Sequence, residues 1–281
     1  MNIPVKSRRL MNSVCNFSVI SLFFANMFLL HGQPVFPQSA DEWIAQGDAF
    51  HVKFDTYSAF KAYKAAYDLD TTNFDAIWKM AGELIDMGNE LPKSSDQMLK
   101  YQEAASIAGK AVELNPNHAK GHIMLAVALE KMASDKSGAE RIKILNQSRT
   151  AAEKAIEINP GEDIGHNLLG RWNRAMTNIG WLTKTYCKLF VVNTPPATYE
   201  GAVDHFTKAI AINQNYISHY LELGKTNVSL EKWAEAGAAF TKVLELPLTE
   251  KGDSKYQREA KHYLQMLQQG NYSELSDSIE E

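Results

Sequence analysis

The chain has few cysteines and no excess of positive charge, and each shortage excludes a class of protein. Two of its 281 residues are cysteine, nine are proline and sixteen are glycine. This is ordinary globular composition, so collagen-like, disordered and disulfide-stapled classes are excluded. The net charge is −4, from 29 basic and 33 acidic residues. A nucleic-acid-binding domain would be expected to have a pI above about 9, so we expect no nucleic-acid partner.

Sequence motifs for catalysis and metal binding are also missing. The chain contains no G-x-x-x-x-G-K-[ST], G-x-S-x-G or H-E-x-x-H pattern. His118 and His122 lie four residues apart with no third ligand nearby, and His122 and His166 occupy the same position of a repeat, where packing explains them. We therefore expect no catalytic residue, metal or cofactor, and an enzyme with a site built in a groove is the weakest of three hypotheses.

The first forty residues contain no acid at all. Lys6, Arg8 and Arg9 precede an apolar run over residues 14–30. A basic segment followed by such a run indicates a secretory signal over residues 1–40, and hence an exported protein, periplasmic or secreted. At 17 residues the run is also at the lower limit for a membrane-spanning helix. A retained N-terminal anchor is therefore the alternative, and an organelle transit peptide is a third, less favoured reading.

Cleavage would change the charge and the cysteine count. The remaining chain would carry 26 basic and 33 acidic residues, a net charge near −7. It would keep only Cys187, which excludes an intramolecular disulfide and a multi-cysteine metal site. Contact with a membrane would then require the uncleaved N-terminal segment.

Five similar segments recur along the chain. Each contains an aliphatic residue before a turn, and these residues are Leu69, Leu114, Ile158, Ile212 and Leu246. Their intervals are 45, 44, 54 and 34 residues. The last interval equals the tetratricopeptide period of about 34 residues, and insertions between helices would lengthen the others. The chain therefore resembles the tetratricopeptide repeat family.

The residues inside each unit keep the same register. In the first unit Gly47 stands on the first helix, and Ala59, Tyr63 and Ala66 follow at the spacing of the second helix. A small residue where two helices touch lets their backbones approach, and a large one fills the next gap. The pattern predicts helices over 41–53, 56–69, 74–87, 96–114, 118–133, 138–158, 163–190, 199–212, 216–229 and 232–246.

The predicted fold is therefore all-α: a tetratricopeptide-type helical-hairpin solenoid of about five units over residues 41–270. A helix near 254–269 should cap its open end, with Lys255, Arg258, Glu259 and Lys261 on a polar outer face. Residues 271–281 are predicted to be an acidic, flexible tail.

One part of the chain resembles a more particular family. The segments 168–172 (LLGRW), 195–200 (PPATYE) and 221–230 (LELGKTNVSL) are similar to motifs of the regulator of microtubule dynamics family. The resemblance implies the repeat fold and association with microtubules and organelle membranes. Microtubule surfaces are acidic, so the negative charge of this chain disfavours direct contact with them.

First helices of such arrays line a concave groove. Asn167, Arg171 and Arg174 share one stripe of a helix, Lys225 is the equivalent of Arg171 in the next unit, and Lys120 lies near the rim. Arginine binds carboxylates bidentately, so we predict a groove for a protein or peptide partner, an acidic one on this chemistry. The alternative is that Arg171 and Arg174 pair with acids of the scaffold, namely Glu153, Glu157 or Asp204.

The insertion in the fourth unit carries a second candidate surface. Its apolar residues follow helical spacing and predict either packing over neighbouring helices or a lip that contacts a partner or membrane. The lip would consist of Trp181, Leu182, Tyr186 and Phe190. The preferred function is thus a non-enzymatic protein-interaction scaffold, and a membrane-tethered cytoskeletal adaptor is the alternative. The sequence leaves the oligomeric state open.

Overall fold

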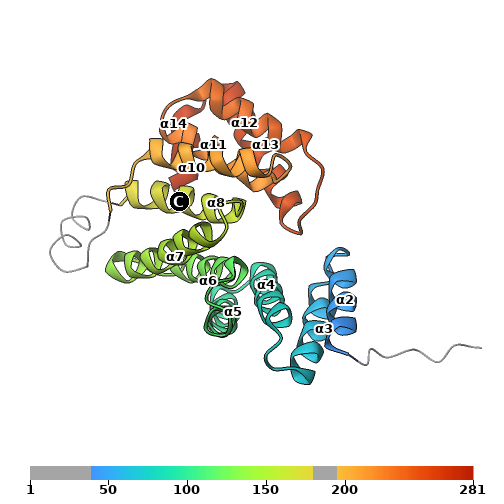
Figure 1. Ribbon diagram of the computed structural model, residues 1–281. Coiled ribbons are helices and arrows are strands. Elements are labelled where there is room, and N and C mark those ends of the chain that lie inside the picture. The colour runs from blue at the N-terminus through green and yellow to red at the C-terminus, as the bar shows by residue number, and fades with distance from the viewer. Residues whose placement is uncertain (1–38, 180–194, 281) are drawn as a thin grey trace, which may run out of the picture. The chain divides into compact units, whose positions relative to one another are not determined.

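A computed structural model describes residues 39–179 and 195–280 of the chain, which belong to one compact unit. Within these ranges it contains twelve α-helices and no strand, which confirms the all-α prediction (Figure 1). None of these helices is both long and apolar enough to cross a membrane. The helices are α2 (Ala40–His51), α3 (Thr56–Leu69), α4 (Phe74–Glu90), α5 (Ser94–Leu114), α6 (Ala119–Ala133), α7 (Gly138–Ile158), α8 (Asp163–Thr177), α10 (Tyr199–Ile212), α11 (Ile217–Ser229), α12 (Trp233–Glu245), α13 (Asp253–Gln269) and α14 (Tyr272–Glu280).

The helices pack in the order of a repeat array. The five hairpins are α2/α3, α4/α5, α6/α7, α8/α10 and α11/α12, and each packs on the next through the contacts between its second helix and the following first helix. First helices also contact first helices, from α2 to α4, α6, α8, α11 and α13 in turn. Helix α13 therefore occupies the position of a sixth first helix, as the prediction of a capping helix requires.

Local sequence explains where many of these helices begin. The side chains of Ser39, Asp55, Asn73 and Thr198 each accept a hydrogen bond from a backbone N–H in the first turn of the helix that follows. These N-caps satisfy donors that have no partner within the helix. Because such signals are local, the helix starts could be read from the sequence within a residue or two.

Glycine and an aromatic ring pack against each other at the same repeat position in three hairpins. The rings of Tyr63, Phe206 and Phe240 lie directly over Gly47, Gly170 and Gly224 respectively, and a Cβ at Gly170 would be 2.6 Å from Phe206. All three rings are essentially inaccessible to solvent. The other two hairpins place alanine at both equivalent positions, and these alanines are fully buried: Ala81, Ala108, Ala126 and Ala152. The small-large-small pattern in the sequence thus corresponds to residues that pack between the two helices of a hairpin.

The structure corrects the predicted length of the fourth first helix. Helix α8 ends at Thr177, whereas the apolar spacing predicted a helix to residue 190. Thr177 donates its hydroxyl to the carbonyl oxygen of Asn173 at 2.8 Å, and Asn178 follows as the C-cap. Threonine and asparagine favour helix ends because their side chains compete for backbone hydrogen bonds.

The acidic C-terminal segment is also more ordered than predicted. Residues Tyr272–Glu280 form α14, and Leu275 is fully buried in the core cluster built by α11, α12 and α13. Tyr272 stacks on Trp233 with ring centroids 4.6 Å apart. The prediction of a flexible tail was wrong because Leu275 and Ile279, four residues apart, form an apolar stripe that anchors the segment.

Candidate functional site

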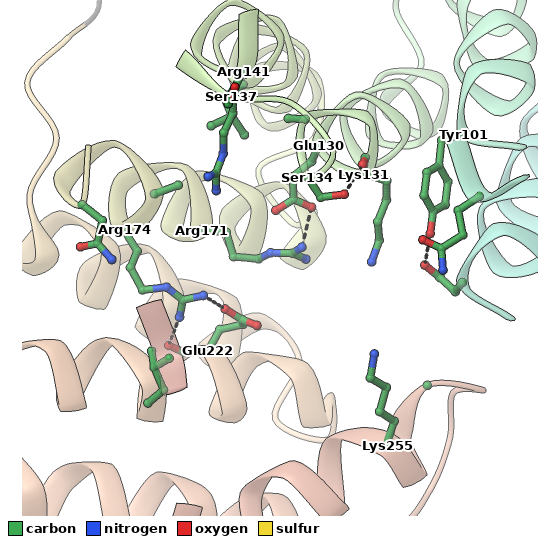
Figure 2. A pocket seen from close by; sticks show the side chains of 18 of the residues that line it. Tyr101, Glu130, Lys131, Ser134, Ser137, Arg141, Arg171, Arg174, Glu222 and Lys255 are labelled. Atoms are coloured by element: carbon green, nitrogen blue, oxygen red, sulfur yellow. Dashed lines mark hydrogen bonds and ion pairs between the residues drawn. The ribbon is translucent and has the colours of Figure 1, made fainter. Parts of the chain in front are cut away.

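A cavity of about 860 Å³ is lined by residues of α4 to α8, α11, α13 and α14 and of the loop before α13. Figure 2 shows a close view of it. The lining is strongly charged, with six basic and four acidic side chains. The basic ones are Lys131, Arg141, Arg171, Arg174, Lys251 and Lys255, and the acidic ones are Asp86, Glu90, Glu130 and Glu222. The volume is within the range of about 300–1,000 Å³ that is typical of ligand sites.

Two of the predicted groove residues, Arg171 and Arg174, line this cavity. Both are engaged by acids of the same chain. The Arg171 Nη2 atom lies 2.6 Å from Glu130 Oε2. Arg174 forms an ion pair with the Glu222 carboxylate and donates to the Glu222 carbonyl oxygen at 3.2 Å (Figure 2). The two guanidinium groups therefore hold α6, α8 and α11 together.

Glu222 is the centre of this charge network. Its side chain is 10% exposed and also lies 3.8 Å from the ammonium group of Lys225. Burial by itself would raise the pKa of Glu222, but the positive charges of Arg174, Lys225 and Arg171 lower it to about 2. Lys225 is held further by an ion pair with Glu259 of α13. Lys225 is not among the residues that line the cavity.

Asn167 lies inside the protein rather than in a groove, which corrects its prediction as a partner-binding residue. It is 3% exposed, and its Nδ2 atom lies 3.0 Å from Nδ1 of the fully buried His219. The His219 Nε2 atom lies 3.1 Å from Asp163 Oδ2, which also accepts a hydrogen bond from Asn213 at 2.9 Å. These contacts join α8 to α11. Burial opposes ionisation of Asp163, but hydrogen bonds from His219 and Asn213 lower its pKa overall.

Lys120 is likewise absent from the cavity lining. Its ammonium group lies 3.0 Å from the carboxylate of the buried Glu162 and thereby links the start of α6 to the turn before α8. The sequence grouped Lys120 with the groove because it lies near the end of a first helix. The structure separates it from Arg171 and Arg174.

The alternative prediction was that Arg171 and Arg174 pair with acids of the scaffold. Both do, but their partners are not the three acids that were predicted. Each of the three acids pairs instead with a base three or four residues away on its own helix. These pairs are Glu153 with Arg149, Glu157 with Lys154, and Asp204 with Lys208. Neighbours at this spacing meet first on a helix surface, so they were not available to Arg171 and Arg174.

Besides Lys251, three basic residues of the cavity did not come from the groove prediction: Lys131, Arg141 and Lys255. Lys255 was predicted on the polar outer face of the capping helix, and the structure places it in the cavity lining instead. No ion pair or hydrogen bond joins these three side chains to a residue of the described ranges. The spacing along one helix could not reveal them because they come from α6, α7 and α13.

A loop far along the chain reaches the first hairpins. Lys251, in the loop before α13, forms an ion pair with Glu90 at the end of α4 and a hydrogen bond with the Thr56 hydroxyl at the start of α3. Thr56 and Lys251 are separated by 195 residues in sequence. Lys251 and Glu90 both line the cavity, so this contact closes one side of it.

The three histidines considered for metal binding have structural contacts. His118 accepts a hydrogen bond from the Lys120 backbone and packs on Phe74, and His122 contacts the Pro116 carbonyl oxygen at 2.9 Å. His166 pairs with His205, Nδ1 to Nδ1, at 3.3 Å. Among the described residues no group of three or more potential ligands could hold a metal ion. The predicted lip residues Trp181, Leu182, Tyr186 and Phe190 lie outside the described residues, as does Cys187.

Comparison with known proteins identifies the family. The model of the regulator of microtubule dynamics protein 1-3 family matches residues 43–268, which is most of the chain. The chain belongs to this family. The resemblance seen in its sequence motifs is thereby confirmed, and it extends over both halves of the repeat array.

Relatives within the family are distant. The mouse regulator of microtubule dynamics protein 1 is 28% identical over 232 residues, which cover 80% of this chain and 73% of the relative. The bovine protein 1 is 25% identical over 260 residues, covering 88% and 80%. Among solved structures, a thermophilic TPR protein of Thermus thermophilus aligns with a TM-score of 0.61 at 15% identity, covering 80% of this chain and 100% of that one. That likeness confirms the tetratricopeptide fold.

Proposed function

We propose that this family member is a non-enzymatic scaffold that binds a peptide or a segment of a partner protein in the charged cavity. The observation that carries the proposal is the cavity itself, which is about 860 Å³ in volume and is lined by eight helices of the array. Tetratricopeptide arrays present such concave surfaces to their partners. The network around Glu222 supports this function by holding α6, α8, α11 and α13 in place, so that the binding surface is pre-organised.

A tryptophan placed in the cavity tests the proposal. Ser137 lines the cavity at the turn before α7, is exposed, and makes no side-chain cap hydrogen bond. Ser137→Trp should fill part of the cavity without disturbing a helix. Proteins that copurify with the full chain are identified by mass spectrometry, and we expect Ser137→Trp to lose most of the specific partner.

Ser106→Trp is the matched control. Ser106 is an exposed residue of α5 that does not line the cavity. Both variants should melt at the temperature of the wild-type protein. Equal partner capture by Ser137→Trp and Ser106→Trp would show that the partner binds elsewhere and would refute the cavity as the binding surface.

A microtubule-related adaptor is the second candidate, and the family match supports it. In this proposal the N-terminal segment stays attached and tethers the repeat array to a membrane. The two candidates differ in what happens to residues 1–40. N-terminal sequencing of the protein from its natural source would find a start near Asp41 for an exported scaffold and Met1 or its neighbour for an anchored adaptor. Cosedimentation of the full chain with microtubules then tests the adaptor directly.

A further inference from the structure

The bases of the cavity are of two kinds. Arg171, Arg174 and Lys251 each form an ion pair with a glutamate of the chain. Lys131, Lys255 and Arg141 have no such partner among the described residues, although they line the same cavity. A positive charge without an acid nearby is common on an open surface. An unpaired positive charge is less common where several helices converge, because it is then repelled by the other positive charges nearby.

Lys131 and Lys255 face one another. Lys131 extends from the last turn of α6 and Lys255 from the first turn of α13, and their side chains point toward each other across the cavity (Figure 2). Lys131 is partly buried and Lys255 is exposed. The guanidinium group of Arg171, on α8, lies beside the end of Lys131 in this view and is joined to Glu130 (Figure 2).

The electrostatics of Lys131 agree with this geometry. Burial lowers its pKa, and the positive charges of Arg171 and Lys255 lower it further. The opposing effects of Glu130 beside it and Glu222 on α11 only partly offset these contributions, since the pKa remains below its ordinary value. Burial is the largest cause of this shift, and a negatively charged ligand would offset the part that comes from Arg171 and Lys255.

We propose that the region between Lys131 and Lys255, flanked by Arg171, is a carboxylate-binding site for an acidic peptide. The site deepens the proposed function and rests on it, since the peptide must occupy the cavity. The ligand group is a carboxylate, supplied by an aspartate or glutamate side chain of the peptide or by its C-terminus. Arg141 extends the positive lining toward α7 and would attract a second acidic group of the same peptide.

The shape of the site favours a peptide over a membrane. A lipid surface presents its headgroups on a broad plane, whereas Lys131 lies partly buried within a cavity whose rim is formed by other helices and by the loop at Lys251. An extended peptide can enter such a space and place single side chains between facing ammonium groups. The lining also includes polar side chains from α4 and α5: Tyr101 donates to Asn89 at 3.1 Å, and Gln97 donates to the Leu91 carbonyl oxygen at 2.6 Å.

Fluorescence anisotropy with labelled hexaglutamate, amidated at its C-terminus, measures binding to the full chain. We expect binding that weakens as salt is raised, and a loss of about tenfold in affinity for the double variant Lys131→Gln/Lys255→Gln. The matched control is Lys110→Gln/Lys261→Gln, which removes the same charge from two exposed lysines outside the cavity. The control should bind hexaglutamate within about twofold of the wild-type protein. Equal losses in both double variants would mean that only the net charge matters, and would overturn the site.

A second peptide separates the two sources of the carboxylate. A labelled hexaglutamine with a free C-terminus carries one carboxylate at its end, and its amidated form carries none. Binding of the free form alone, lost in Lys131→Gln/Lys255→Gln, supports the site with a C-terminal ligand. If neither hexaglutamate nor the free-terminus peptide binds, the carboxylate site is wrong, while partner loss in Ser137→Trp would still support the proposed function.

Vesicles test the competing class of ligand. The full chain is sedimented with vesicles of phosphatidylcholine and phosphatidylserine in equal parts, and with vesicles of phosphatidylcholine alone. We expect Lys131→Gln/Lys255→Gln to leave any vesicle binding unchanged. Vesicle binding that depends on these two lysines, with no peptide binding, would replace the acidic peptide by an anionic lipid and overturn the proposal.

Discussion

The cavity has two sides that differ in how their charges are balanced. Toward α8 and α11, Arg174 is paired with Glu222 and Arg171 with Glu130, so that both bases have an acid within the chain. Glu222 also contacts Lys225, which lies outside the cavity lining. Toward α6 and α13, Lys131 and Lys255 face each other without one. The sequence predicted Arg171, Arg174 and Lys225 on first helices that line a groove, and Lys255 on the outer face of a capping helix. The structure therefore shows that a basic residue in a repeat groove can serve the scaffold or remain available to a ligand.

The difference follows from burial. A charged group in a helix-helix contact is costly unless it is paired, and the side chain of Glu222 is only 10% exposed. Lys255 is exposed and can stay hydrated without a partner. A base in a packed contact, such as Arg174, therefore needs an acid, whereas an exposed base such as Lys255 does not. Four substitutions test this contrast.

The largest effect is expected for Glu222→Gln, which removes the acid from the paired side. It leaves Arg174 and Lys225 without their shared partner at a packed contact, so the free energy of unfolding at pH 7 should fall by about 3 kcal/mol. Urea denaturation measures this change, and Glu113→Gln on the exposed surface of α5 is the control. The stabilisation from Glu222 should be complete above about pH 4.5 and decline as the pH falls toward its folded pKa of about 2. A fall in stability no larger than that of Glu113→Gln would show that the paired side does not depend on Glu222.

Asp86→Asn tests a buried acid that lines the cavity. The positive charges of His51 and Lys251 only partly offset the cost of its negative charge. Burial and the nearby charge of Glu83 raise the pKa of Asp86 to about 6. The Asp86 carboxyl group therefore binds its proton more tightly in the folded state than in the unfolded state. At a pH above its folded pKa of about 6 the carboxylate is ionised, and this charge destabilises the folded state. Asp86→Asn should raise the free energy of unfolding by about 1–2 kcal/mol at pH 7.5, and the gain should vanish near pH 3.5. A gain that is the same at both pH values would mean that charge is not its cause.

Lys131→Met tests the unpaired side. Because the pKa of Lys131 is lowered in the folded state, its charged form destabilises the protein at neutral pH. Methionine keeps the length and removes the charge, so thermal unfolding at pH 7 should show a stabilisation of about 1 kcal/mol. This gain should shrink as the pH rises toward 10.5 and the wild-type lysine loses its proton. Destabilisation by Lys131→Met at pH 7 would show that Lys131 has a stabilising partner.

The smallest effect on stability is expected for Lys255→Gln. The side chain is exposed and has no ion pair with a described residue, so its removal should change the free energy of unfolding by less than about 0.5 kcal/mol. Chemical denaturation in parallel with Glu222→Gln compares the two sides under the same conditions. Destabilisation of Lys255→Gln by more than about 1 kcal/mol would remove the distinction between them.

Much of the fold could be predicted because its determinants are local or periodic. N-cap side chains mark helix starts, and the glycine-aromatic pairs repeat at a spacing that specifies one hairpin. One predicted helix was too long, and one helix was missed. Apolar spacing continued past Thr177, where α8 stops, and acidic composition hid the burial of Leu275 in α14. In α14 a short apolar stripe is stabilised as a helix because the surface of α11, α12 and α13 covers it.

The candidate site was predictable only in part. Helical spacing placed Arg171 and Arg174 together, and both line the cavity. The same spacing placed Asn167 there, although it is buried against His219 between α8 and α11. A position on one helix indicates which residues share a stripe, but it does not say whether a neighbouring helix covers part of that stripe. Lys131 and Lys255 come from helices more than a hundred residues apart in sequence, so no single-helix pattern could join them.

The sequence by itself determined the repeat, the family and the pairing of helices into hairpins, because these depend on residues close together in the chain. The tertiary structure decided which charges are neutralised. Arg174 and Glu222 are 48 residues apart in sequence, and they meet only because α8 packs on α11. The free lysines are likewise a product of packing, since α6 and α13 bring two like charges to one cavity without an acid between them. Coulomb interactions act over distance in space, and only the packed fold sets that distance.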